Sequence, residues 1–385
     1  VEQNFLSLGH NVTFLTNEKS IIKKRHIDIE SGEHYFRSDY FDSCDALSID
    51  MLAKIDINNF DFVVISDYNK GLITKKIVAY VRLISMEAVI NGVKVPNSLL
   101  SELKETNLKN TTDEKLRQTL NDNGYLFLRN VIEKNDITKA RNDIFEKLKN
   151  VDELEDPFTE GIWSGRSKRD ELHKDRGVFW EDVSNTESLR KITNGNNLKS
   201  VFSRIFGISS IGFDFIFLRA VSGGKFTHMH CDAGFFTRKT QKVLTCWLVF
   251  TDITIDKGPL FIIEGSHKFS DIKTKYKGFD VDIHKHMKAT IDTNPITFAQ
   301  ERNTKILTTQ FNPGDALIFG MYTVHGTFEN YSNDKKIRLT CDIRFQPNNE
   351  LKDPRYFGPK PTGTTGAGYG ELNSARPLNE DWHVR

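Results

Sequence analysis

The stretch FTHMHCDAGFF, residues 226–236, carries two histidines and an aspartate at alternating positions. If the stretch is a β-strand, side chains two residues apart point to one face, so His228, His230 and Asp232 share a face. Two imidazoles and one carboxylate on one side of a metal form the facial triad of non-haem Fe(II) oxygenases, which leaves positions open for substrates. The stretch therefore predicts a metal site made of His230, Asp232 and a more distant histidine.

The remaining ligand is predicted to be His325, which follows an apolar strand candidate at residues 315–320. The long interval between His230 and His325 is enough for several strands, so an antiparallel double sheet can return one histidine beside the other. A fourth protein ligand would occupy a position that O₂ or a cosubstrate needs. His228 is therefore expected to contact a ligand or the substrate rather than the metal.

The sequence around these residues predicts an α+β domain. From residue 211 to 347, successive apolar runs separated by turn signals are typical of a jelly roll or sandwich. Residues 113–150 precede them with a helix pattern, an Asn-Gly break, a strand from Tyr125 to Arg129, and a second helix pattern. Residues 161–182 are charged and aromatic without a period, which favours a solvated loop or a lid over a site.

Several motifs in this region resemble the phytanoyl-CoA dioxygenase family and occur in the family's order. They are LNDNGYLFLRNVI (120–132), His230-Cys231-Asp232, DKGPLFIIEGSHK (256–268), FNPGDALIF (311–319) and RLTCDIRF (338–345). The resemblance covers residues 113–347 and implies a double-stranded β-helix, or cupin-like jelly roll, with flanking helices. It also implies the cofactors: Fe(II), the cosubstrate 2-oxoglutarate, and O₂.

Carried onto this sequence, the resemblance makes His230, Asp232 and His325 the catalytic iron ligands. It implies that Arg338 binds the far carboxylate of 2-oxoglutarate with help from Thr327. The residue type suits that task, because the planar guanidinium pairs bidentately with a carboxylate and keeps its charge.

Two positions depart from the family pattern or stay ambiguous. Lys336 occupies the nominal place of the anchoring arginine, and a turn through residues 331–335 that is longer by two would put Arg338 there instead. Trp247 resembles a tryptophan that lines the cosubstrate pocket, but its apolar run VLTCWLVF fits a core residue equally well. Both alternatives stay open on the sequence.

The resemblance implies hydroxylation of a small-molecule substrate with release of succinate and CO₂. Related halogenases replace the metal-binding carboxylate by a small residue, whereas this chain keeps Asp232. Three other functions are considered: a non-catalytic jelly-roll binding protein, a remnant of a sugar kinase, and a zinc hydrolase that uses the same three ligands. ATP turnover with a heptose or hexose phosphate would favour the kinase. Binding of less than about one Fe(II) per chain, without an effect of 2-oxoglutarate, would exclude the oxygenase.

The N-terminal part resembles a different family. IKKRHIDIESGEHYFRSDY (22–40) and VVISDYNKG (63–71) are similar to ribokinase-like sugar kinases, in particular heptose-phosphate kinases. The Gly-rich GTTGAGYG (363–370) lacks the strand, helix and Lys that would hold phosphate, so kinase activity is not expected. The expected organisation is a partial, non-catalytic α/β ribokinase-like segment (1–85), a linker (86–112), the oxygenase domain (113–347) and a Gly/Pro-rich C-terminal extension (348–385).

The composition of the chain limits which classes of binding partner are expected. The chain has 53 Lys+Arg and 52 Asp+Glu, a net charge of +1, so nothing favours nucleic acid or an anionic membrane surface as a partner. The sequence has no long apolar run and no signal-peptide pattern. The four cysteines form no CxxC pair, which favours a reducing, cytoplasmic setting. A small-molecule substrate is the expected partner, and the oligomeric state is left open.

Overall fold

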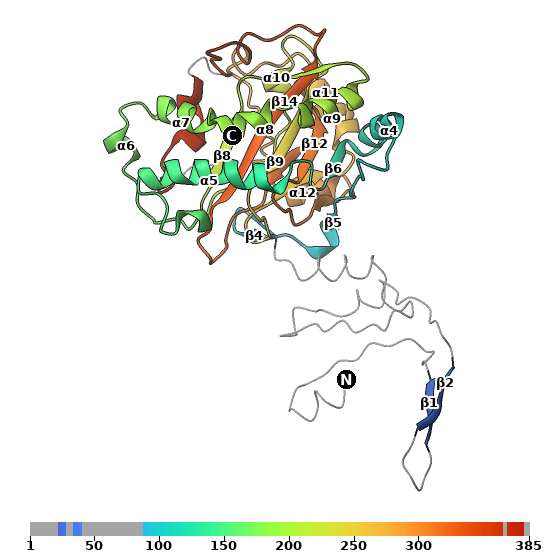
Figure 1. Cartoon of the computed structure of the whole chain (residues 1–385). Helices are drawn as coiled ribbons and strands as arrows, with labels where there is room; N and C mark the ends of the chain where they lie inside the picture. Colours follow the sequence, from blue (N-terminus) through green and yellow to red (C-terminus); the bar gives the residue numbers. More distant parts are fainter. Residues whose placement is uncertain (1–21, 28–33, 41–87, 365–367, 381–385) are drawn as a thin grey trace. The chain divides into compact units, whose positions relative to one another are not determined.

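The computed structural model of the chain describes four segments (Figure 1), which are residues 22–27, 34–40, 88–364 and 368–380. Contacts divide the chain into two units, Val1–Met86 and Glu87–Arg385. In the first unit, β1 (Ile22–Ile27) and β2 (His34–Tyr40) form an antiparallel pair. The rest of the kinase-like segment, including residues 63–71, lies outside the described residues, so the resemblance to sugar kinases stays a prediction.

Two β-sheets form the centre of the second unit, and each draws strands from distant parts of the chain. The four-stranded sheet has the order β13 (His325–Thr327), β10 (Leu260–Ile263), β11 (Ile306–Thr308) and β5 (Leu100–Glu102). The six-stranded sheet has the order β6 (Tyr125–Leu128), β12 (Ala316–Gly320), β9 (Leu244–Val249), β14 (Arg338–Pro347) and β7 (Ser210–Gly212), with β8 (Phe217–Val221) also on β14. Together with the helices, these sheets confirm the α+β class.

Side chains of both sheets meet in one apolar core. Phe127, Trp247 and Leu317 come from the six-stranded sheet, and Leu260 and Ile262 come from β10 of the other sheet. Burying each such side chain stabilises the fold by about 1.5–3 kcal/mol. The sheets therefore face each other, and a residue on an inner face points into the space between them.

Helices cover the outside of the six-stranded sheet (Figure 1). They are α4 (Asp113–Asn123), α5 (Lys134–Asn150), α8 (Glu187–Thr193) and α9 (Asn196–Phe206). Thr112 caps α4 by accepting a hydrogen bond from the Lys115 amide, and Gly124 ends it in the left-handed region at φ 80°. The helix, the Asn-Gly break and the strand at Tyr125 match the prediction from sequence, because each depends on local residues.

The charged segment at residues 161–182 is partly helical rather than an irregular loop. It contains α6 (Arg169–Leu172) and the start of α7 (Arg176–Ser184). Asp175 caps α7 by accepting hydrogen bonds from the Gly177 and Val178 amides. Trp180 is fully buried, and this packing gives the helix a stability that the mixed sequence pattern does not reveal.

Two segments expected outside the oxygenase domain are built into it. Within the expected linker at 86–112, β5 pairs in parallel with β11, and a small hairpin forms from β3 (Val89–Ile90) and β4 (Val93–Lys94). The C-terminal segment returns to the domain, where Arg169 donates hydrogen bonds to the carbonyls of Ala375 and Arg376 at 2.8 and 2.9 Å. Composition alone suggested loose segments, because such long-range hydrogen bonds leave no local pattern.

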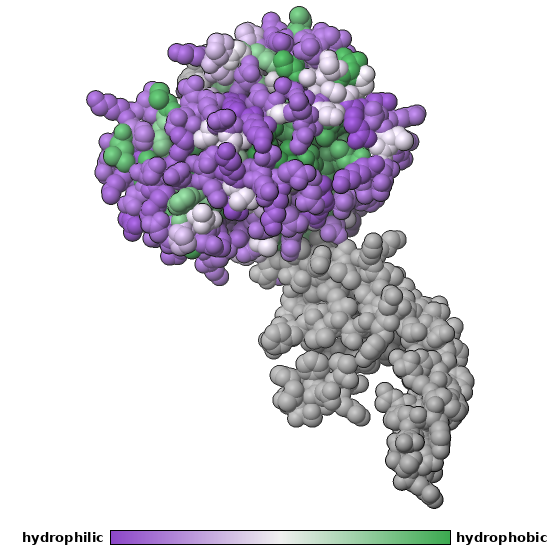
Figure 2. Space-filling view, viewed as in Figure 1, coloured by the Kyte–Doolittle hydropathy of each residue, from purple (hydrophilic) through white to green (hydrophobic). Residues whose placement is uncertain are grey.

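Short elements complete the second unit. They are α10 (Ala233–Phe236), α11 (Ser270–Tyr276), α12 (Pro295–Glu301) and the 3₁₀ turns η2 (Asn97–Leu99), η3 (Phe158–Glu160), η4 (Ser266–Lys268), η5 (Gly368–Glu371) and η6 (Asn373–Ala375). The face of this unit seen in Figure 2 is mostly hydrophilic, with hydrophobic residues in a few places. Among the described residues, no helix has both the length and the apolar character needed to cross a membrane.

Candidate metal centre

Three residues predicted as metal ligands lie together between the sheets. One ligand atom from each of His230, Asp232 and His325 lies within 4.8 Å of the others, and Nε2 of His230 is 3.7 Å from Oδ1 of Asp232. The His230 and His325 backbones exchange two hydrogen bonds of 2.9 Å, which fixes the imidazoles side by side. All three side chains are buried. The arrangement is a pocket of two imidazoles and one carboxylate.

The chain reaches this arrangement by a turn rather than by a continuous strand. His230 forms isolated bridges with His325 and Thr290, and Asp232 then adopts helical dihedral angles (φ −78°, ψ −9°) ahead of α10. The predicted sharing of one strand face by His228 with the other two is wrong, because the chain is not extended there. His228 is exposed, while His230 and Asp232 are buried.

Both imidazoles present the same nitrogen to the centre of the site. Nδ1 of His230 lies 2.7 Å from the carbonyl oxygen of His228, and Nδ1 of His325 lies 2.9 Å from that of Thr323. A carbonyl only accepts, so each Nδ1 carries the proton and donates it. The Nε2 lone pairs are therefore free to bind a metal, and the backbone holds each ring in that orientation.

Burial keeps both imidazoles neutral. It lowers the pKa of His230 to about 3, with a further contribution from the neighbouring His325, and it also lowers the pKa of His325. A neutral imidazole is the form that binds a metal. At neutral pH the pair is thus ready to bind without first losing a proton.

The carboxylate of Asp232 is held through one of its oxygens. Thr245 and Arg344 both donate to Oδ2, at 2.5 and 3.1 Å, which leaves Oδ1 on the side of His230. Burial alone would raise the pKa of Asp232, but the charge of Arg344 and the hydrogen bond from Thr245 oppose it, and that pKa lies below its usual range. Asp232 is therefore ionised, with one oxygen anchored and the other available.

Arg338 is a buried cation without a hydrogen-bond or ion-pair partner among the described residues. Its side chain is 1% exposed, Nε and Nη1 make no hydrogen bond, and no ion pair joins it within the described residues. Burial lowers the pKa of Arg338 to about 9, and the nearby Arg219 lowers it as well, so the guanidinium still carries its charge at neutral pH. A buried unpaired charge is costly unless an anion meets it. The position suits a carboxylate ligand.

Lys336 lies on the surface instead. Its Nζ donates to Oε2 of Glu160 at 2.7 Å, and its side chain is 39% exposed. A lysine already paired in solvent has no need of a further anion. Of the two residues that the sequence left open, only Arg338 lies inside the domain.

Thr327 and Trp247 also face the interior. Thr327 lies opposite Leu260 on β10, and its hydroxyl accepts a hydrogen bond from the Thr227 amide at 2.8 Å. Trp247 lies opposite Asp342 of β14 and meets the ring of Phe311 edge to face at 4.9 Å. Thr327 keeps a hydroxyl proton to donate, whereas Trp247 is already packed in the core.

Replacing Trp247 by alanine is expected to destabilise the chain by about 3–5 kcal/mol, the cost of a large cavity in a core. Chemical denaturation of the variant measures this loss. Leu351→Ala is the control, because that side chain is 70% exposed. Unchanged stability together with a weakened response to 2-oxoglutarate would contradict the core role.

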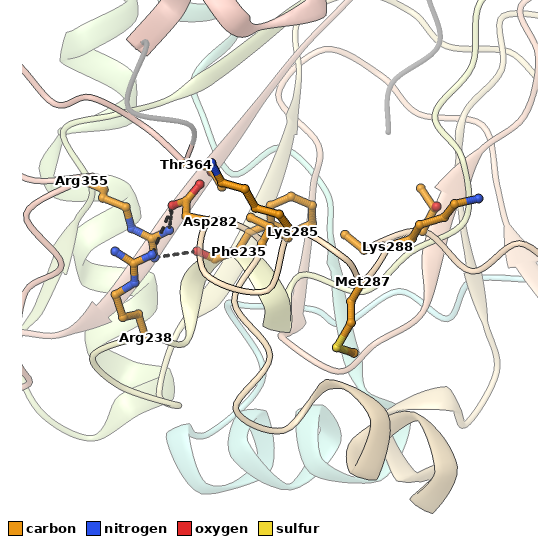
Figure 3. Close-up of a pocket in the computed structure, with 11 residues that line it drawn as sticks. Phe235, Arg238, Asp282, Lys285, Met287, Lys288, Arg355 and Thr364 are labelled. Atoms are coloured by element: carbon orange, nitrogen blue, oxygen red, sulfur yellow. Dashed lines mark hydrogen bonds and ion pairs between the residues drawn. The ribbon is translucent and has the colours of Figure 1, made fainter.

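One cavity is lined by two of the predicted ligands, and a second cavity lies next to it. The smaller, of about 100 Å³, is lined by His230 and Asp232, and its walls include Phe215, Phe217, Phe236, Arg219 and Arg344. We call it the iron pocket. The larger, of about 820 Å³, is shown in Figure 3 and includes Arg238, Lys285, Lys288 and Arg355 in its lining. Phe235 and Thr364 line both cavities, which are therefore neighbours.

Sequence reasoning missed the charged residues around Asp232. Arg338, Thr340, Asp342 and Arg344 alternate along β14 and share its inner face, where Asp342 accepts a hydrogen bond from Arg219 at 2.7 Å. The signal was present as polar residues at every second position after Arg338. Thr245 left no comparable signal, because only strand pairing sets it opposite Arg344.

Comparison with known families and proteins gives one family match. A family profile described as phytanoyl-CoA dioxygenase (PhyH) matches residues 120–338, more than half of the chain. No curated protein sequence matches the chain.

Solved structures with a similar fold have low identity. The epimerase SnoN, in complex with Fe³⁺, alpha ketoglutarate and nogalamycin RO, is 16% identical, covers 63% of this chain and 86% of its own, and has a TM-score of 0.42. EvdO2 from Micromonospora carbonacea var. aurantiaca, complexed with 2-oxoglutarate, is 16% identical over 63% of this chain and 95% of its own, with a TM-score of 0.40. Apo EctD from S. alaskensis is 15% identical, covers 77% of this chain and 94% of its own, and has a TM-score of 0.44.

Proposed function

This chain belongs to the phytanoyl-CoA dioxygenase family, and we propose that His230, Asp232 and His325 hold the iron of its Fe(II)- and 2-oxoglutarate-dependent oxygenase activity. The protein is thus an oxidoreductase that uses Fe(II), 2-oxoglutarate and O₂. The observation that carries the residue assignment is the convergence of three buried ligand atoms within 4.8 Å. We propose further that the organic substrate is a small molecule and that the reaction is a hydroxylation.

The donor set fits Fe(II). Two neutral imidazoles and one ionised carboxylate are a facial triad, which suits Fe(II) and leaves positions for a cosubstrate and O₂. Because the backbone holds both Nδ1 atoms, and Thr245 and Arg344 hold Oδ2, the three donor atoms are already aimed at one point. Such support reduces the reorganisation needed for iron to bind.

The two facing sheets support a finer description of the fold. Strands close in sequence are divided between the sheets, as β9 and β10 are, and the proposed ligands lie between the sheets. This arrangement fits a double-stranded β-helix, or jelly roll. The iron site then lies inside the double sheet.

Arg338 is proposed to bind the far carboxylate of 2-oxoglutarate. It is a charged side chain of the inner face without a protein partner, and a bidentate carboxylate would satisfy its open N–H groups. Thr327 is proposed to donate its hydroxyl proton to the same carboxylate, since the hydroxyl oxygen accepts from Thr227. Trp247 is proposed to border the cosubstrate from the core side.

When iron and 2-oxoglutarate are bound, they supply the oxidation of a C–H bond by O₂, with succinate and CO₂ as coproducts. The chain's own residues position the reactants. Thr245 and Arg344 keep Oδ1 of Asp232 turned to the metal. The rings of Phe217, Phe235 and Phe236 line the iron pocket with apolar surface, which excludes water from the reacting carbon.

Anaerobic titration of the whole chain with Fe(II) tests the proposal, with and without 2-oxoglutarate. We expect about one Fe(II) per chain and tighter or spectroscopically altered binding when 2-oxoglutarate is present. Succinate formation in air, screened against sugars, nucleotide sugars, acyl-CoAs and amino acids, then identifies the substrate class. Binding of clearly less iron, without an effect of 2-oxoglutarate, would rule out the proposal.

Replacing Thr245 by valine is expected to weaken Fe(II) binding by about 10–100-fold, because the buried oxygen Oδ2 of Asp232 loses a donor. Anaerobic Fe(II) titration measures the change. Thr340→Val is the matched control, since that hydroxyl is buried on the neighbouring strand and has no hydrogen-bond partner. Equal iron affinity in both variants would show that Thr245 does not support Asp232.

The remaining predictions concern organisation and location. The kinase-like segment, residues 1–85, is proposed to contribute nothing to the chemistry, because the proposed ligands and their supports all lie in the second unit. A reducing, cytoplasmic setting is favoured by three free, buried cysteines, Cys231, Cys246 and Cys341.

A further inference from the structure

We infer that Arg219 binds a carboxylate of the organic substrate in the iron pocket, so that the substrate is a carboxylic acid with an apolar or aromatic body. This inference rests on the proposed function of the site. It assigns Arg338 to the cosubstrate and Arg219 to the substrate. The observations that carry it are the contacts of Arg219, the charges around it and the walls of the pocket.

Arg219 lines the iron pocket, and its terminal N–H groups make no hydrogen bond to the described residues. It lies on β8 opposite Thr340 of β14, and its Nε donates to Oδ2 of Asp342 at 2.7 Å. This is its one hydrogen bond or ion pair in the part of the chain that the structure describes. The side chain is 14% exposed and lines the same pocket as His230 and Asp232. Its two terminal nitrogens are therefore open to a ligand, and a planar guanidinium suits a carboxylate.

The two arginines on the inner face of β14, Arg338 and Arg344, are engaged differently. Arg344 donates to Asp232, and its guanidinium lies 4.6 and 4.2 Å from the ring centroids of Phe217 and Phe236. Arg338 is 1% exposed and does not line the iron pocket. Arg344 also lines the iron pocket, and its Nε and Nη1 have no hydrogen-bond partner among the described residues, but these atoms are buried. Its side chain is 4% exposed, against 14% for Arg219, so a molecule in the pocket reaches the donors of Arg219 more readily.

The charges in and beside the iron pocket leave room for one anion. Two buried arginines, Arg338 and Arg344, and the partly exposed Arg219 face two buried aspartates, Asp232 and Asp342. Fe(II) and the 2-oxoglutarate dianion have opposite charges of equal size, so loading the site leaves one positive charge in excess. Glu371 at the pocket is exposed, so solvent screens its charge. A monocarboxylate would balance the interior.

The side chains that line the iron pocket indicate the chemical character of the rest of the substrate. Phe215, Phe217, Phe235 and Phe236 give it aromatic surface, which favours an apolar or aromatic body. Phe235 and Thr364 also border the larger cavity of about 820 Å³ shown in Figure 3, which offers space for a longer body.

The larger cavity offers a competing place for the carboxylate. Figure 3 shows Arg238 and Arg355 beside Asp282, and each of them pairs with carboxylates, Arg238 with Asp280 and Arg355 with Asp353. Lys288 lies apart from this cluster and is exposed. An exposed lysine is a weak competitor for a carboxylate, because water already solvates it. It nevertheless provides the matched control.

The test uses the whole chain with Fe(II) and 2-oxoglutarate under anaerobic conditions. Acetate, benzoate, phenylacetate and 3-phenylpropanoate are compared with their amides by the shift in thermal unfolding temperature. Succinate formation in air gives a second readout. We expect the aromatic acids to bind and to raise succinate formation, and the amides to do neither. Arg219→Gln should weaken binding of the acids by about 30-fold or more, the loss expected when a buried charge loses its partner.

Four variants show whether a loss of binding comes from the proposed contact of Arg219 with the substrate. Arg219→Gln should leave the KM for 2-oxoglutarate within about threefold, while Arg338→Gln should raise it strongly. Lys288→Gln should keep the preference for acids. The double variant Arg219→Gln with Asp342→Asn removes both members of the pair, so it tests the preference without leaving Asp342 unpaired if the single variant folds poorly.

Several results would overturn the inference. They are equal responses to acids and amides, a rise in the KM for 2-oxoglutarate in Arg219→Gln as large as in Arg338→Gln, or loss of the acid preference in Lys288→Gln. The absence of any iron-dependent 2-oxoglutarate turnover in the unaltered chain would instead remove the proposed function, and this inference with it. Turnover without a preference for acids would remove the inference alone.

Discussion

Replacing His230 or Asp232 by alanine is expected to abolish iron binding and with it all 2-oxoglutarate turnover. Each substitution leaves two ligands for a metal that the proposed site would bind through three protein donors. Asp232→Ala also leaves Arg344 without the carboxylate that now accepts its hydrogen bond, inside a buried pocket. Anaerobic Fe(II) titration and succinate formation measure the two losses separately.

His228→Ala is the control for both variants. His228 is two residues from His230, but its side chain is exposed and does not join the cluster of ligand atoms. Its removal should leave iron binding intact. Turnover that persists in His230→Ala or Asp232→Ala would contradict the assignment of the triad, and iron lost in His228→Ala would show a fourth ligand.

Arg338→Ala is expected to weaken 2-oxoglutarate binding by about 2–5 kcal/mol, which corresponds to roughly 30-fold to several thousandfold. The physical reason is that the cosubstrate's carboxylate would be left in a desolvated site without its cation. The KM for 2-oxoglutarate measures the loss. Iron binding in the absence of 2-oxoglutarate should change little, because Arg338 makes no hydrogen bond to the proposed iron ligands.

Two further variants make this result specific. Arg338→Lys keeps the charge but loses the planar fork, so it should recover only part of the affinity. Lys336→Ala removes a surface ion pair with Glu160 and should leave the KM for 2-oxoglutarate unchanged. If Lys336→Ala did more damage than Arg338→Ala, the anchor would be the lysine.

Local patterns in the sequence were enough to predict several features. The helix at 113–123 and its end before Tyr125 follow from a Thr cap and an Asn-Gly break, which act within a few residues. The His-x-Asp spacing and the ordered motifs indicated the family that the profile match shows. The same patterns named His230, Asp232 and His325, which the structure brings together.

Features that depend on pairing between residues far apart in the chain could not be predicted from the sequence. Only the pairing of β9 with β14 sets Thr245 opposite Arg344, and only the turn at Asp232 separates the exposed His228 from the buried ligands. Likewise, the charged segment that contains Arg169 and the C-terminal carbonyls it binds are about two hundred residues apart. No periodicity in the chain records such contacts.

The residue types available for the chemistry can be read from the chain's residues alone: two histidines, one aspartate and an arginine near the distal histidine. How the cations are used depends on the way the chain folds. Lys336 lies in solvent with Glu160, Arg338 lies inside without a hydrogen-bond partner among the described residues, and Arg219 lines the iron pocket. The physical reason is that desolvation and pairing, rather than residue type, decide whether a buried charge is satisfied or open to a ligand.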